Sequence, residues 1–127
     1  MANSEFIHVS YELEESGLVW HPEIGDEVCS RDPEELRVSI LVDPQGMTPL
    51  QLRETFLWLP TVEQLVTQIE VRQAMLYHAG VSAEALTYET VIKTNDGFIE
   101  AAAKSLRIAI GKALNGLLTG SSTGVVH

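Results

Sequence analysis

The spacing of hydrophobic and polar positions changes near residue 46 of the 127-residue chain. Before this point apolar residues mostly alternate with polar ones, which is typical of half-buried strands. After it they recur every three or four residues, which indicates amphipathic helices. The pattern therefore predicts a strand-rich N-terminal part followed by a largely helical part.

The N-terminal part is predicted to form an antiparallel β-meander. A first strand is expected at residues 6–13, where every second residue is apolar, with a turn at 15–17. Residues 18–30 are expected to form one bent strand or two short ones, because Pro22 interrupts the run. A further strand is predicted at residues 36–42. One face of this last strand is expected to carry Leu36, Val38, Ile40 and Val42, with Leu41 as the exception.

Two consecutive helices are predicted after this meander, at residues 49–58 and 62–79. Each follows a Thr-x-x-Gln sequence, whose threonine and glutamine side chains can cap the first backbone N–H groups reciprocally. Pro60 separates the helices, because the residue before a proline is driven out of the helical region. Gly80 is expected to end the second helix. The apolar stripe predicted along that helix consists of Val62, Leu65, Ile69 and Leu76.

The last third of the chain is predicted to hold a strand and a long amphipathic helix. Residues 86–94 are rich in β-branched side chains and favour a strand, with continued helix after Ser82 as the alternative. Asn-Asp-Gly at 95–97 then breaks the element. A helix is predicted at about 98–118, and its two glycines are interpreted as sites of close helix packing. Its apolar stripe is predicted to contain Ile99, Ala102, Leu106, Ala109, Ile110, Ala113 and Leu117.

These elements predict one α+β domain over residues 1–120 and a flexible C-terminal tail at 121–127. Hydrophobic residues make up 45% of the chain and charged residues 20%, which is typical of a globular protein. The single cysteine excludes an intramolecular disulfide and favours a reducing compartment. Because no signal-peptide pattern or long apolar run is present, we expect a cytoplasmic, soluble protein.

Charge is distributed unevenly along the sequence, which has a net charge of −10. Residues 1–50 contain eleven acidic side chains and two basic ones, whereas residues 101–127 contain three basic side chains and no acidic one. A strongly acidic chain repels phosphate backbones and anionic lipids, so neither nucleic acid nor a membrane is an expected partner. The basic face of the last helix is expected to pair with the acidic region, within one chain or between two subunits.

The densest group of possible metal ligands is formed by His21, Glu23, Asp26 and Cys29, with Glu27 beside them. Carboxylates and an imidazole could bind a divalent ion. Their spacing matches no zinc or calcium loop, however, and a solvated acidic turn is the favoured interpretation. Cys29 is also a weak candidate nucleophile, because the surrounding acidic residues disfavour its thiolate.

We therefore expect a non-catalytic interaction or regulatory protein that self-associates, most simply as a dimer, and needs no cofactor. The alternative is a small metal-dependent enzyme or hydrolase that uses the segment from His21 to Cys29. Ligand sensing in a pocket between sheet and helices is a third possibility. The candidate interface residues combine aromatic anchors with the basic helical face: Phe56, Trp58, Tyr77, Lys104, Arg107 and Lys112.

Overall fold

The computed structural model describes residues 2–34 and 37–120, which form four helices and two three-stranded antiparallel sheets. The predicted α+β class is confirmed, whereas the predicted tail at 121–127 lies outside the described residues. The elements are α1 (Ala2–Glu15), β1 (Glu27–Ser30), β2 (Val38–Ile40), α2 (Pro49–Thr55), β3 (Phe56–Trp58), α3 (Val62–Glu70), β4 (Met75–Ser82), β5 (Thr87–Thr94), β6 (Gly97–Ala103) and α4 (Leu106–Leu118).

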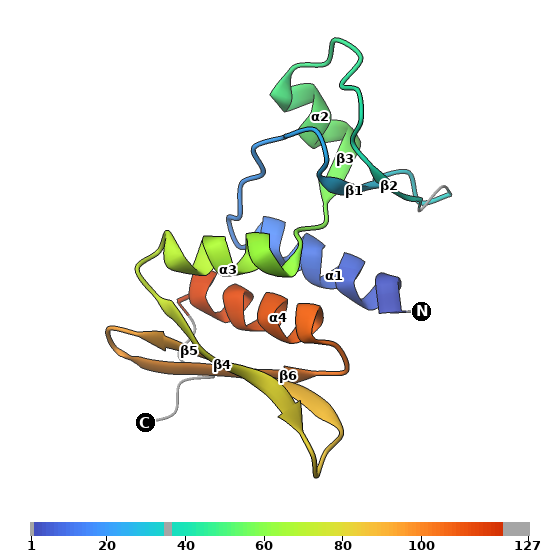
Figure 1. The fold of residues 1–127 in the computed structure, drawn as a ribbon. Coiled ribbons are helices and arrows are strands. Elements are labelled where there is room, and N and C mark those ends of the chain that lie inside the picture. Colours follow the sequence, from blue (N-terminus) through green and yellow to red (C-terminus); the bar gives the residue numbers. More distant parts are fainter. Residues whose placement is uncertain (1, 35–36, 121–127) are drawn as a thin grey trace.

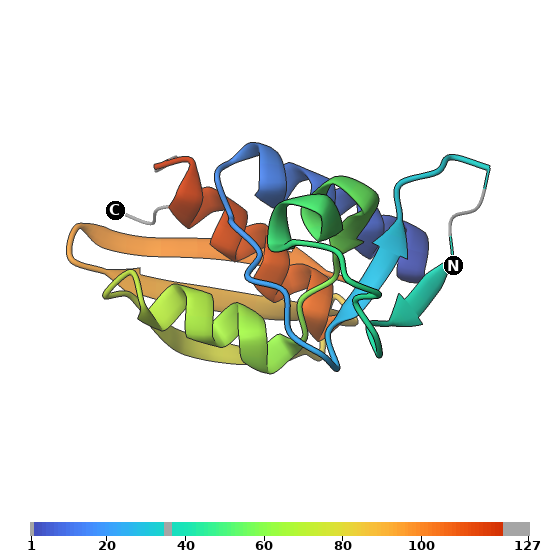
Figure 2. The same cartoon turned by 90° about the horizontal axis from the view of Figure 1, so that it is seen from above.

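The main body is layered (Figure 1). The larger sheet, in the order β4-β5-β6, forms one outer layer, and α4 lies across it. Helices α1 and α3 cover α4 from the other side, as the view from above also shows (Figure 2). The smaller sheet, in the order β2-β1-β3, sits with α2 beyond α1 and α3. Every described helix therefore lies on the same side of the larger sheet.

Helix α4 is the centre of the hydrophobic core. Six consecutive or nearly consecutive residues of this helix are buried, since it has the sheet on one side and two helices on the other. Ile108, which is not part of the predicted stripe, is among them. A helix with neighbours on most of its circumference needs apolar residues nearly all round. The buried residues are Ile108, Ala109, Ile110, Gly111, Ala113 and Leu114.

The crossing of α4 with α1 depends on a glycine. A Cβ added at Gly111 would lie 2.9 Å from Cγ1 of Val9 and 3.4 Å from Cε1 of Phe6. A Cβ at Gly116 would similarly lie 3.1 Å from Cγ2 of Ile99. The prediction that these two glycines permit close packing is therefore confirmed, although Gly116 approaches a strand rather than a helix.

Gly111→Ala is expected to lower the free energy of unfolding by about 1 kcal/mol, because overpacking outweighs the gain in helix propensity. Denaturant unfolding followed by circular dichroism measures this change. The double variant Gly111→Ala, Val9→Ala removes the obstructing methyl groups and serves as the control. In the Val9→Ala background the glycine substitution should no longer be destabilising. A destabilisation of equal size in both backgrounds would contradict the proposed steric cause.

The first predicted strand is wrong, because residues 6–13 lie in α1. Their alternating pattern also contains a helical spacing, and the structure buries Phe6, Val9 and Leu13 on the side that meets the core. The turn expected at 15–17 is present at Ser16 and Gly17, where it ends α1. There Gly17 has φ +104°, and the N–H of Leu18 donates to the carbonyl of Leu13.

Two predicted helices are partly wrong, because each contains a strand of the larger sheet. The helix predicted at 62–79 ends at Glu70, and β4 follows from Met75, so Gly80 lies within a strand. The helix predicted at 98–118 begins only at Leu106, after β6. The predicted strand at 86–94 is confirmed as β5, and it provides the pairing partner for both new strands. Sheet pairing has overridden local helix propensity in both segments.

Strands β1–β3 and helix α2 form a separate lobe, which we call the small lobe, and its elements differ from the prediction in their bounds. The first predicted helix ends at Thr55, and residues 56–58 form β3. Within residues 18–30 only Glu27–Ser30 is a strand. In the strand predicted at 36–42, the core residue is Leu41, whereas Ile40 and Val42 are exposed and Leu36 is outside the described residues. Both capping boxes, Thr48 with Gln51 and Thr61 with Gln64, are confirmed.

Candidate functional site

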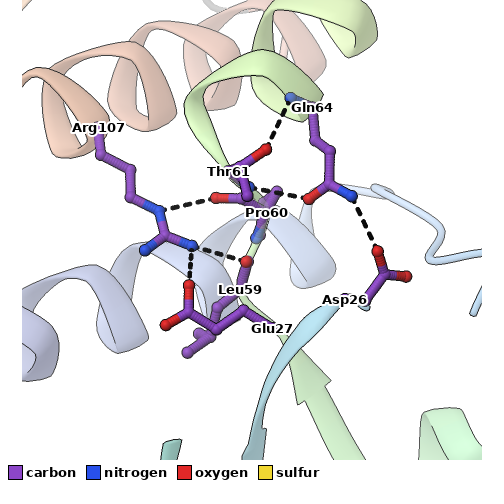
Figure 3. A network of polar contacts seen from close by, with 7 residues as sticks. All are labelled: Asp26, Glu27, Leu59, Pro60, Thr61, Gln64 and Arg107. Atoms are coloured by element: carbon purple, nitrogen blue, oxygen red, sulfur yellow. Dashed lines mark hydrogen bonds and ion pairs between the residues drawn. The ribbon is translucent and has the colours of Figure 1, made fainter. Parts of the chain in front are cut away.

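Asp26 is a buried carboxylate whose oxygens accept three hydrogen bonds. Oδ2 accepts from Nε1 of Trp20 at 2.8 Å and from the backbone N–H of Glu23 at 2.9 Å. Oδ1 accepts from Nε2 of Gln64 at 2.9 Å, and Oε1 of the same amide accepts from the backbone N–H of Thr61 (Figure 3). Asp26 therefore connects the 18–26 segment to the capping box of α3, and these donors already occupy both of its oxygens.

A cavity of about 280 Å³ lies beside this network, between the 18–26 segment and α3. Three of the predicted metal ligands, His21, Glu23 and Asp26, line it together with Trp58 and residues of α3. Within the described ranges, however, no three His, Cys, Asp or Glu side chains are grouped so that they could hold a metal ion. The structure thus places these residues on one wall without forming a metal centre there.

Cys29, the fourth predicted ligand, lies apart from this cavity in the hydrophobic core. Its thiol Sγ is 3.4 Å from the carbonyl oxygen of Ser30, and burial raises the pKa of the thiol above its ordinary value. The protonated thiol is a poor nucleophile and a poor metal ligand. Cys29 therefore packs as an apolar core residue, apart from His21, Glu23 and Asp26.

Arg107 joins α4 to the small lobe through its forked guanidinium (Figure 3). Nε donates to the carbonyl of Pro60 at 2.8 Å, and Nη2 donates to the carbonyl of Leu59 at 2.7 Å and to Oε1 of Glu27 at 2.8 Å. The guanidinium also stacks over Phe6, with its Cζ atom 4.2 Å from the ring centroid. This predicted interface residue is consequently engaged inside its own chain, with 25% of its side chain exposed.

The other basic residues of the last helical segment differ in their engagement. Nζ of Lys112 is 3.7 Å from Glu5 on α1, so a second ion pair joins α4 to the acidic N-terminal region. Lys104 is exposed just before α4. Two of the three positive charges therefore meet negative charges of the same chain, which is the first of the two pairings predicted from the charge asymmetry.

Two of the aromatic interface candidates, Phe56 and Trp58, belong to the small lobe. Phe56 and Trp58 are half-buried on β3 and contact the cluster around Trp20 and Leu52. Nε1 of Trp58 is buried and has no hydrogen-bond partner among the described residues. Trp58 also packs against the main core and so joins the small lobe to the rest of the molecule, whereas Phe56 packs within the small lobe.

Tyr77, the third aromatic candidate, lies on the face of the larger sheet that is turned away from α4. Its ring meets that of Phe98 edge to face at a centroid distance of 5.4 Å, and 59% of its surface is exposed. Met75 is 50% exposed on the same face. Figure 1 shows no element of the described chain beneath this face. We call it the open face.

Sheet register arranges the side chains of the open face in three rows that each cross all three strands. Residues that pair across antiparallel strands project to the same face, and Thr90 and Ile92 of β5 are fully buried on the opposite one. A bulge between Leu76 and His78 carries Tyr77 to the open face. The first row is Met75–Lys93–Phe98, the middle row is His78–Val91–Glu100, and the last row is Gly80–Glu89–Ala102.

Tyr77, predicted to lie on a helix, belongs to β4, and the other residues of the open face were not predicted as a surface. A usable signal was present in β5, where Glu89, Val91 and Lys93 alternate with buried residues. Asn-Asp-Gly at 95–97, interpreted only as a breaker, also separates two paired strands. The links made by Asp26 and Arg107 left no comparable signal, because their partners are distant in sequence.

Comparisons with known proteins found no family model, no curated protein and no solved structure that matches this chain. None of the helices in residues 2–34 and 37–120 has both the length and the apolar character required to cross a bilayer.

Proposed function

We propose that this chain is a cytoplasmic, non-catalytic interaction protein that self-associates through the open face of its larger sheet. The observation that carries the proposal is the exposure of Met75 and Tyr77 beside Phe98 and Val91 on a sheet layer that no described element covers. Contiguous apolar surface of this kind marks interaction sites in soluble proteins. The single, buried, unpaired cysteine supports the proposed compartment.

A second copy of the chain is the partner that best fits this surface. The face carries both signs of charge, Lys93 in the first row and Glu89 in the last, on either side of the apolar Val91. Large side chains, Met75 and Phe98, occupy the first row, whereas Gly80 and Ala102 occupy the last. A surface with these opposite halves is complementary to itself.

The size of the face predicts a weak, concentration-dependent dimer. At about 3.3 Å per residue and 4.8 Å between strands, it measures about 25 Å by 14 Å. This footprint is smaller than the roughly 800 Å² per partner of a standard stable interface. We therefore expect a dissociation constant of about 10–100 μM, with dimer detectable at high protein concentration.

Sedimentation equilibrium over about 5–500 μM protein tests the proposal. The wild type should approach dimer mass, and Tyr77→Glu should weaken association at least tenfold by placing a charge in the contact. Val81→Glu is the matched control, because Val81 is 62% exposed on β4 but pairs with Tyr88 on the opposite face. This control should dimerise like the wild type. The same measurement is made on the full chain and on a variant that ends at residue 120. If both stay monomeric over this range, the proposal is overturned.

A further inference from the structure

We infer that the two copies pack face to face about a two-fold axis that runs between the sheets, perpendicular to the strands and through the middle row. This inference rests on the proposed self-association and specifies its geometry. The axis reverses strand direction, so β5 crosses β5 of the second copy antiparallel. The first row of each copy then lies over the last row of the other.

This arrangement satisfies size and charge together. It sets Met75 over Gly80 of the second copy and Phe98 over Ala102 of the second copy, so that large side chains meet small ones. It also sets Lys93 opposite Glu89 of the second copy. Because the symmetry repeats every contact, two such ion pairs form around a central contact between the Val91 side chains.

A two-fold axis parallel to the strands gives a poorer match. It would place Lys93 opposite Lys93 and Glu89 opposite Glu89 of the second copy, so that like charges face each other near the centre. The large side chains of the first row would then also face large ones. In the antiparallel arrangement each middle-row residue faces its own copy, so His78 lies opposite His78 at the β4 edge and Glu100 opposite Glu100 at the β6 edge. The two carboxylates form the contact between like negative charges.

Charge reversal distinguishes the two arrangements. In the antiparallel dimer, Lys93→Glu and Glu89→Lys each turn two attractive contacts into repulsive ones, so each variant should dimerise about tenfold more weakly. The two substitutions change net charge in opposite directions, so an effect of net charge alone would weaken one variant and strengthen the other. The double variant restores both pairs and should dimerise within about threefold of the wild type.

Glu100→Gln provides a gain-of-function test by the same sedimentation measurement. It removes the contact between the two Glu100 carboxylates of the antiparallel dimer and should strengthen dimerisation about threefold. If the wild type dimerises but the single reversals leave its dissociation constant unchanged, or Glu100→Gln weakens association, the antiparallel geometry is wrong while the proposed function stands. If the wild type is monomeric, the proposed function itself fails. Circular dichroism of each variant verifies that the exposed substitutions leave the fold intact.

Discussion

Arg107→Met is expected to lower the free energy of unfolding by about 2–4 kcal/mol, because one side chain satisfies three acceptors between α4 and the small lobe. Methionine retains the apolar stem and some contact with Phe6 but donates no hydrogen bond. The carbonyls of Leu59 and Pro60 and the Glu27 carboxylate would lose their donor. Urea unfolding followed by circular dichroism measures the loss.

Lys112→Met on the same helix is the matched control. Lys112 also pairs with an acidic residue, but its side chain is 43% exposed and its nitrogen is 3.7 Å from Glu5. Exposed pairs contribute little, so this change should stay within about 0.5 kcal/mol of the wild type. If Arg107→Met costs no more than Lys112→Met, the guanidinium does not hold the two parts of the fold together.

Lysine at position 107 separates the charge from the fork geometry. Arg107→Lys keeps the positive charge but cannot direct donors along the two lines that reach Pro60 and Leu59. We expect the free energy of unfolding of Arg107→Lys to lie between those of the wild type and Arg107→Met. Full stability in Arg107→Lys would show that charge alone accounts for the contribution.

Asp26→Asn is expected to destabilise the protein by about 2 kcal/mol although the two side chains have the same shape. Both carboxylate oxygens accept hydrogen bonds, and an asparagine NH₂ group must face a donor in either orientation. Rotating the Gln64 amide cannot relieve this conflict, because its Oε1 already accepts from the N–H of Thr61. One donor therefore stays unsatisfied.

Unfolding of the Asp26 variant can be followed by tryptophan fluorescence, since the Trp20 indole donates directly to this carboxylate. Glu23→Gln is the control, because Glu23 contacts Asp26 through its backbone while its side chain is exposed. That variant should remain within about 0.5 kcal/mol of the wild type. An Asp26→Asn protein as stable as the control would contradict the role given to the network.

Features encoded by neighbouring residues could be predicted from the sequence. Each Thr-x-x-Gln sequence specifies its own capping box, because donor and acceptor lie within three residues of each other. The β-branched run at β5 and the apolar spacing of Leu65 and Ile69 were likewise sufficient. Charge composition also predicted that the last helix would meet the acidic region, without identifying the paired residues.

Features encoded by distant residues could not be predicted in the same way. Residues 6–13 fit either a strand or a helix, and the close approach of Val9 to Gly111 accompanies the helix. Residues 98–103 have the alanine content of a helix but pair with β5 as a strand. An alternating or alanine-rich segment of this length is compatible with both periods, so its packing partner decides its conformation.

The candidate sites likewise combine features set by neighbouring residues with features set by distant ones. The sequence alone identified Asp26, Tyr77 and Arg107 as residues of interest and established the opposite charges of the two chain ends. Only the tertiary structure showed that Asp26 and Arg107 are occupied by internal contacts and that Tyr77 lies on a sheet face that no described element covers. The physical reason is that hydrogen bonding and exposure depend on contacts between residues far apart in the chain, whereas capping and periodicity depend on neighbours.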